Sequence, residues 1–457
     1  MLPSPSTDID QARLPSRGRT EDGLPQLEPK SHPVVQHVPE GADFPALEGL
    51  PAELRTALLL NMPDLATLSR LIHASPVFHA QYLLDRKSIL FRALLRETTD
   101  DVFVDIYAAF RSHPSRIGPP IGPNTNVTGF LGLYSAWRSP GGTDRPTADI
   151  CPFDDICWMA WFHQSTVNPL ATHFVSWALA NFRSGPLRPS ALGGAETLTR
   201  TEKTRVVRAL YRLEVFCHLF CDSHYESFIG MDINELFFSG LGLEPWEAEE
   251  VCSIYAFVKE KYEAVVGDVK WDLDETNPKF DDEFEPELEG LAFPIDKEYD
   301  EFLNGTIGHG GLSLALKLVT TETHDKRVDL MTKSLRIGGD FLEEAMGFAA
   351  QRHRRDSSHF DDRDRAEERR QAMVFAGDEA GAPPLAWTLL WGGRSSNLFG
   401  GYVPDELRRW GYVMWDARRI DVDGTKEYLK DLWASSPELM LVCRHWAWMS
   451  DMPKSLD

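Results

Sequence analysis

Cysteine is scarce in this chain, and long apolar runs are missing. The 457 residues contain six cysteines, too few for a disulfide framework, so reduced thiols and an intracellular location, cytoplasmic or nuclear, are expected. No run of about 18 apolar residues occurs, so no transmembrane helix is expected. The first residues, MLPSPSTDIDQARLPSRG, contain no apolar core segment, which predicts that they are not a secretory signal.

Basic residues are also few compared with acidic ones. Lysine and arginine number 47 against 70 aspartates and glutamates, which gives a formal net charge of -23. A nucleic-acid-binding protein needs a dense basic surface to displace counterions, and docking on anionic lipid needs basic segments. The sequence shows no basic stripe of either kind. We therefore expect neither nucleic acid nor a membrane to be a partner.

Motifs for catalysis and phosphate binding are missing as well. GGRSSNLFGG (392–401) is not G-x-S-x-G, and no H-E-x-x-H occurs. IGHGGLSLAL (307–316) lacks the Lys-Ser/Thr of a phosphate loop, and its glycines are expected to form a turn before a helix that begins at Leu312. DLDETN (272–277) and DVDGTKE (421–427) are incomplete as calcium loops. The sequence predicts no enzymatic activity and no cofactor.

The segment CHLFCDSH raises the question of a metal. Cys217, Cys221 and His224 share one helical face. Structural zinc sites, however, place paired ligands in a turn, with a second pair elsewhere in the chain. The neighbours Phe216 and Phe220 are apolar, which favours buried free thiols over a zinc site. No metal site is therefore predicted.

Helical periodicity dominates the chain, and strand-type alternation is almost absent. The sequence predicts an all-α protein. Helices are expected over 153–183, 196–229, 244–266, 299–320, 326–350 and 431–449. The longest, 196–229, carries a broad apolar face made of Val207, Leu210, Tyr211, Leu213, Val215, Phe216 and Phe220.

The chain divides by composition into three regions. Residues 1–43 are rich in proline, serine and charge and are expected to be disordered. Residues 44–96 form a short module of three helices, and 97–457 form a large, irregular helical domain. Long loops are expected near 112–152, 267–300 and 351–383. The sequence assigns no role to the acidic stretch 267–289 or the charged stretch 351–371; a docking patch for basic partners is one alternative for the acidic stretch.

The N-terminal module has more apolar surface than three short helices can bury among themselves. Pro51, Pro63 and Pro76 each stand where a helix begins. In the first helix, Leu59 and Leu60 fall outside the main apolar stripe and interrupt the polar face. Either the rest of the chain or another protein must cover the excess.

The order of residues in this module resembles an F-box, in particular the F-box-like segment of filamentous fungal proteins. The resemblance is carried by Leu50-Pro51-Ala52-Glu53-Leu54, Leu58, Leu59, Met62, Asp64-Leu65, Leu68, Ile72 and Ser75-Pro76-Val77-Phe78-His79. It covers about residues 45–85. RALYRLEVFCHLF and LRRWGYVMWDARRI are similar to segments that follow such regions in fungal proteins of unassigned function.

The resemblance implies a function without chemistry of its own. An F-box binds the Skp-type adaptor of a cullin-type ubiquitin ligase, and the rest of the chain recruits a protein substrate, which the sequence does not identify. The positions that match the adaptor-binding surface are Leu50, Pro51, Leu54, Leu58, Leu59 and Met62. The alternative is a structural or protein-interaction protein that engages no ubiquitin ligase, in which the helical domain covers these side chains.

Overall fold

The computed structural model is all-α within the residues that it describes. These residues are 47–117, 125–139, 145–184, 197–220, 237, 241–280, 293–295, 297–338, 370–393, 403–422 and 424–435. They contain no β-strand, and an isolated β-bridge pairs Asp274 with Phe293. The predicted fold class is therefore confirmed. All of them belong to one unit that begins at Leu47, whereas the tail predicted over 1–43 lies outside the described residues.

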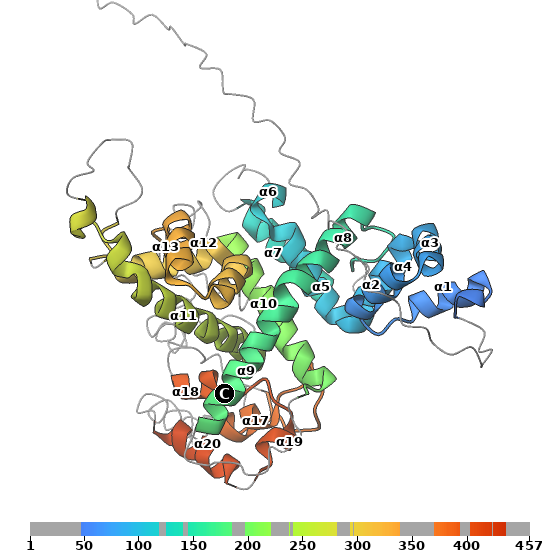
Figure 1. Ribbon diagram of the computed structural model, residues 1–457. Helices are drawn as coiled ribbons and strands as arrows, with labels where there is room; N and C mark the ends of the chain where they lie inside the picture. Colours follow the sequence, from blue (N-terminus) through green and yellow to red (C-terminus); the bar gives the residue numbers. More distant parts are fainter. Residues whose placement is uncertain are drawn as a thin grey trace, which may run out of the picture. The chain divides into compact units, whose positions relative to one another are not determined.

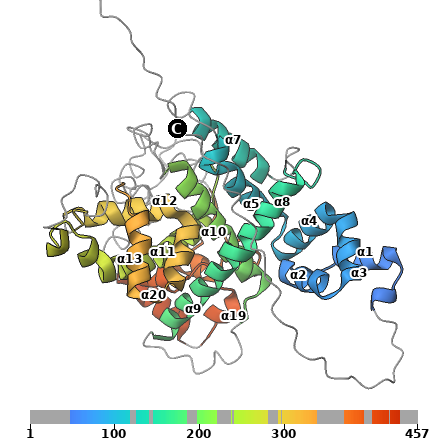
Figure 2. The same ribbon diagram turned by 45° about the horizontal axis from the view of Figure 1, so that its top comes forward.

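Four short helices open this unit and group together in Figures 1 and 2. They are α1 (Ala52–Leu60), α2 (Leu65–Ala74), α3 (Pro76–Leu84) and α4 (Arg86–Glu97), preceded by the 3-10 turn η1 (Leu47–Gly49). Asp64 and Ser75 start α2 and α3, because their side chains accept backbone N–H groups of the first turn. Three helices were expected over 44–96, but the segment after Pro76 forms two, because Asp85 separates α3 from α4.

The helices that follow include two that the sequence did not predict. They are α5 (Asp100–Ser112), α6 (Pro114–Ile117), α7 (Thr125–Arg138), α8 (Phe153–Phe162), the π-helical turn η2 (His163–Val167) and α9 (Asn168–Ser184). A loop was expected near 112–152, but α6 and α7 lie inside it. Phe130, Tyr134 and Trp137 recur at helical spacing and are buried where α7 packs on α5, so packing offsets the low helix propensity of two glycines.

The centre of the unit is α10, which packs against α5, α9, α11 and α12 (Figure 1). The bounds are α10 (Arg200–Phe220), α11 (Pro245–Leu273), α12 (Tyr299–Thr320) and α13 (His324–Ser334), which packs on α11. All seven residues of the predicted apolar face of α10 are buried. The same helix also buries Glu202, Arg205, Arg208, Arg212 and Glu214, so its polar side does not face water.

The long helix α11 begins as expected and ends later. Pro245 opens it, and Glu244 and Glu247 form a capping box. The loop predicted from residue 267 begins only after Leu273, because Val269 and Leu273 are buried and extend the apolar stripe of the helix. Part of that predicted loop, 281–292, lies outside the described residues.

The C-terminal helices pack against each other and against α9 and α11. They are α17 (Leu385–Trp391), α18 (Asp405–Arg409), α19 (Ala417–Ile420) and α20 (Thr425–Ala434). The rings of Trp246 and Trp387 meet edge to face, with centroids 5.1 Å apart, and connect α11 to α17. The helix expected over 431–449 starts earlier, at Thr425, and residues beyond 435 lie outside the described part of the chain.

Candidate functional site

Exposed leucines gather in the first helices. Ten large apolar side chains are exposed among the described residues, and four of them, Leu47, Leu54, Leu83 and Leu84, lie between residues 47 and 84. Isolated exposed apolar side chains are ordinary, whereas several in one short segment make that segment a candidate for an interaction surface. These four residues are called the exposed N-terminal leucines below.

The six predicted adaptor-binding residues differ in exposure. Pro51 and Leu54 are exposed, and the Leu54 residue keeps 52% of its surface accessible. Leu50 and Leu58 are half-buried. Leu59 and Met62 are buried in the core. The outer part of α1 is therefore available to a partner, while its inner part holds the helix in place.

The module itself supplies most of the cover for α1. The helix packs mainly on α3 and α4. Gln81 Nε2 donates to Thr56 Oγ1 at 2.8 Å, and Arg96 donates to the Asn61 side chain. The described residues of the large helical domain thus leave the Leu54 side of α1 open.

Glu97, the last residue of α4, joins the module to the rest of the unit. Its carboxylate accepts hydrogen bonds from the Leu65 N–H at 3.1 Å, Gln164 Nε2 at 2.9 Å, Asn168 Nδ2 at 2.7 Å and Lys203 Nζ at 3.2 Å. The wide π-helical turn η2 precedes α9, and its Gln164 is one of the donors to Glu97. Such turns are rare and often serve a specific geometric need.

The environment of Glu97 favours its charged form. Burial by itself raises the pKa of a carboxyl group, and only 5% of this side chain is exposed. The contacts with His163, Lys203 and the Leu65 N–H outweigh burial and hold the pKa of Glu97 well below its usual range. The module is therefore anchored by a buried carboxylate.

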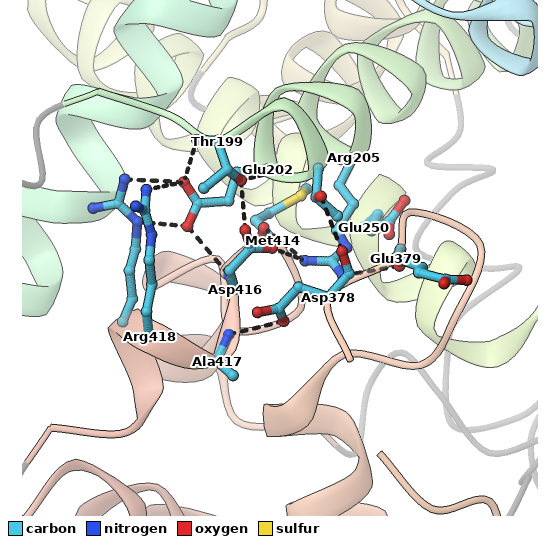
Figure 3. Close-up of polar contacts among 12 residues, drawn as sticks. Thr199, Glu202, Arg205, Glu250, Asp378, Glu379, Met414, Asp416, Ala417 and Arg418 are labelled. Atoms are coloured by element: carbon cyan, nitrogen blue, oxygen red, sulfur yellow. Dashed lines mark hydrogen bonds and ion pairs between the residues drawn. The ribbon is translucent and has the colours of Figure 1, made fainter. Parts of the chain in front are cut away.

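A polar cluster around Glu202 and Arg205 connects α10 with the C-terminal segment (Figure 3). Arg205 Nη1 donates to Asp416 Oδ1 at 3.0 Å, and Thr199 Oγ1 donates to Asp416 Oδ2 at 2.5 Å. Arg419 Nε donates to Glu202 Oε1 at 2.6 Å. The side chains of Glu202 and Arg205 have no exposed surface, and their charges are paired with Arg419 and Asp416, so the cluster acts as a structural clamp.

A second buried ionic cluster lies between α5, α7, α10 and α11. Arg212 Nη2 lies 3.0 Å from Glu247 Oε1, and Arg212 Nε lies 3.3 Å from Asp105 Oδ2. Arg138 adds a contact of 3.1 Å to Glu247, and Tyr134 donates to Asp105 at 2.5 Å. Four helices are thereby joined at one point.

A pocket of about 430 Å³ opens between α8, α10 and α12. Its described lining residues are His113, Pro114, Trp158, Trp161, Phe162, Glu214, Cys217, His218, Gly308, His309, Gly310, Gly311 and Ser313. Trp161 and His309 are exposed, so they mark its mouth. The rings of Trp158 and Phe162 stack with centroids 5.0 Å apart. This volume lies within the range of ligand sites, roughly 300–1,000 Å³.

Three side chains beside this pocket have the order of a hydrolytic triad. Ser112 Oγ lies 2.9 Å from His218 Nδ1, and His218 Nε2 lies 3.4 Å from Glu214 Oε1. Ser112, however, is completely buried and is not among the described residues that line the pocket. A nucleophile must reach its substrate. Ser112 is therefore no accessible nucleophile, and the contacts among Ser112, His218 and Glu214 orient the Glu214 carboxyl group.

Gly311 makes room for Glu214. It has φ +51° and ψ -155°, where side chains are strained, and it breaks α12 just before Leu312, as the sequence predicted. The Leu312 N–H donates to Glu214 Oε2 at 2.7 Å. A Cβ atom on Gly311 would lie 2.5 Å from that oxygen.

Replacing this glycine should disturb both the backbone and the carboxylate. We expect Gly311→Ala to lower the free energy of unfolding by roughly 2–3 kcal/mol, measured by urea denaturation. The matched control is Gly132→Ala, where a Cβ meets nothing within 4 Å and α7 is helical. This control should be neutral or slightly stabilising. Equal stability of Gly311→Ala and the wild type would contradict the strain argument.

Comparison of the chain with protein-family models, with curated proteins and with solved structures gives no match. Within the described part of the chain, no group of three His, Cys, Asp or Glu side chains is placed to hold a metal ion. Cys217 is buried, while Cys221 and His224 lie outside the described residues. No helix among the described residues is long and apolar enough to cross a membrane.

Proposed function

We propose that this protein is an F-box-like substrate receptor, which binds the Skp-type adaptor of a cullin-type ubiquitin ligase through α1 and holds a target protein with its larger helical part. The observation that supports this most is the open outer side of α1. Leu54 and Pro51 are exposed there, and the packing of α1 on α3 and α4 leaves them uncovered.

The exposed N-terminal leucines add to this support. Burying apolar surface is the main favourable term in protein association, and a few well-placed side chains contribute most of the binding energy. The Glu97 contacts also fit a receptor, because they fix the module to α9 and α10. Target and ligase would then be held close together, which raises their effective concentration.

The test is a pull-down with purified Skp-type adaptor. The wild type should bind, and the Leu54→Asp/Leu58→Asp double variant should lose binding by a factor of about 100 or more, since two apolar contacts are replaced by charges. The matched control is Leu133→Asp, because Leu133 on α7 is 53% exposed, close to the value for Leu54. Circular dichroism should be unchanged in all variants.

The outcome decides between the receptor and its alternative. No binding by a well-folded wild type, or equal loss in the Leu133→Asp control, would rule out an adaptor surface on α1. The protein would then be a structural or interaction protein that engages no ubiquitin ligase. The interaction partner of the exposed N-terminal leucines would have to be sought elsewhere.

A further inference from the structure

The pocket between α8, α10 and α12 has walls and a charge that suit a cation. Trp158, Trp161 and Phe162 give it aromatic faces, and Glu214 is the one carboxylate among its described lining residues. No lysine or arginine is among those residues. Aromatic faces attract cations through the ring quadrupole, and the attraction grows when the cation loses water.

Glu214 contributes its carboxyl group to the wall of the pocket. The side chain is 6% exposed, and one oxygen accepts the Leu312 N–H. His218 Nε2 lies 3.4 Å from the other oxygen, Oε1, and His218 Nδ1 lies 2.9 Å from the Ser112 hydroxyl, which donates to the Ala109 carbonyl oxygen at 3.1 Å. Within the described part of the chain no lysine or arginine is paired with Glu214, so its carboxylate can still accept hydrogen bonds from a cationic ligand.

The hydrogen bond from the Leu312 N–H to Glu214 argues against an anionic ligand. The Leu312 N–H begins the second half of α12, after the break at Gly311, and helix N-termini attract anions. Glu214 already occupies this position from within the chain. Arg116, close to Pro114 in sequence, is paired with Asp155 at 3.7 Å and lies over the Phe110 ring, so it is engaged elsewhere.

The geometry points to a binding site for a guanidinium group, an arginine side chain presented by a protein segment. Guanidinium is planar, weakly hydrated and able to stack on aromatic rings while it donates to a carboxylate, so it fits this pocket better than ammonium. The exposed Trp161 at the mouth offers a surface to the residues that flank the arginine. The net charge of -23 also favours a basic partner. That this arginine belongs to the target protein rests on the proposed function.

The test is calorimetric titration of the full chain with acetyl-Gly-Gly-Arg-Gly-Gly-amide. We expect a dissociation constant on the order of 1 mM or tighter for this small ligand. The peptide with citrulline in place of arginine, which has the same shape without the charge, should bind at least about tenfold more weakly. Acetyl-arginine amide separates the two sources of guanidinium: weaker binding than the peptide indicates a protein segment, and equal binding indicates a small molecule.

Variants locate the site. Glu214→Gln keeps an acceptor for the Leu312 N–H and should weaken binding about tenfold or more. Trp161→Ala should weaken it about fivefold through the lost cation–π contact. Trp161 is 60% exposed, so this variant should fold; the matched control is Trp271→Ala on α11, where the tryptophan is 55% exposed and away from the lining.

The results separate this site from the adaptor surface. Glu214→Gln should still bind the adaptor, and Leu54→Asp/Leu58→Asp should still bind the peptide. The proposal is overturned if the wild type does not bind the arginine peptide, if citrulline binds equally well, or if Trp271→Ala weakens binding as much as Trp161→Ala does.

Discussion

Arg212→Met should lower the free energy of unfolding by about 3–5 kcal/mol, because it removes one of the cations from a buried ionic cluster. The Arg212 side chain lies within 3.3 Å of Asp105 and 3.0 Å of Glu247, and the side chains of all three residues are nearly inaccessible to water. Burial lowers the pKa of an arginine, but these two carboxylates raise the pKa of Arg212 above its usual value. Methionine preserves the apolar stem and leaves the carboxylates without this partner.

Urea denaturation measures the effect. The matched control is Arg92→Met, because Arg92 is an exposed arginine on α4, and its replacement should change stability by less than about 0.5 kcal/mol. Arg212→Lys should fall between wild type and Arg212→Met, since an ammonium group keeps the charge without the planar fork. A loss below about 1 kcal/mol for Arg212→Met would mean that the cluster is not a main source of stability.

Removing the Glu97 carboxylate should have the second largest effect. We expect Glu97→Ala to cost roughly 2–4 kcal/mol, because the amides of Gln164 and Asn168 lose their acceptor and Lys203 loses its partner. Since Glu97 ends α4, backbone amides of α4 should also exchange with solvent faster in the variant. Glu53→Gln, on the exposed start of α1, is the control and should leave stability unchanged.

The contribution of Glu97 should depend on pH in a defined direction. Its pKa in the folded chain lies well below that of an unfolded glutamate, about 4.3. The carboxylate therefore stabilises the fold at neutral pH, and this stabilisation declines as the pH falls below about 4. The stability difference between wild type and Glu97→Gln, measured by urea denaturation from pH 7 to pH 3, should stay constant at first and then shrink. A difference that grows on acidification would contradict this argument.

The sequence determined the helical character of the chain, and it did so through local signals. Spaced apolar residues, Pro245 and the capping glutamates placed α11 correctly at its start, because caps and periodicity act within one or two turns. The turn at Gly311 was also predictable from its glycines. The order of residues 50–79 suggested an F-box, and this stays a prediction.

The tertiary structure decided where the charges of α10 go. On a helical wheel, Glu202, Arg205 and Arg212 belong to the polar side, and sequence reasoning would place them in water. They are buried because other helices surround α10, and partners distant in sequence, such as Asp416 and Glu247, neutralise them. No local pattern encodes those pairings. The sequence signal for this burial was the polar content of α10, which is unusual for a helix with so broad an apolar face.

The same distinction applies to the candidate sites. The sequence named the leucines of α1, but only packing on α3 and α4 separates the exposed Leu54 from the buried Leu59. The pocket could not be predicted, because its walls come from α8, α10 and α12, which are far apart along the chain. Local propensity and spacing thus determined which helices form, whereas burial, ion pairing and pocket shape depend on contacts between distant segments, which only the folded chain brings together.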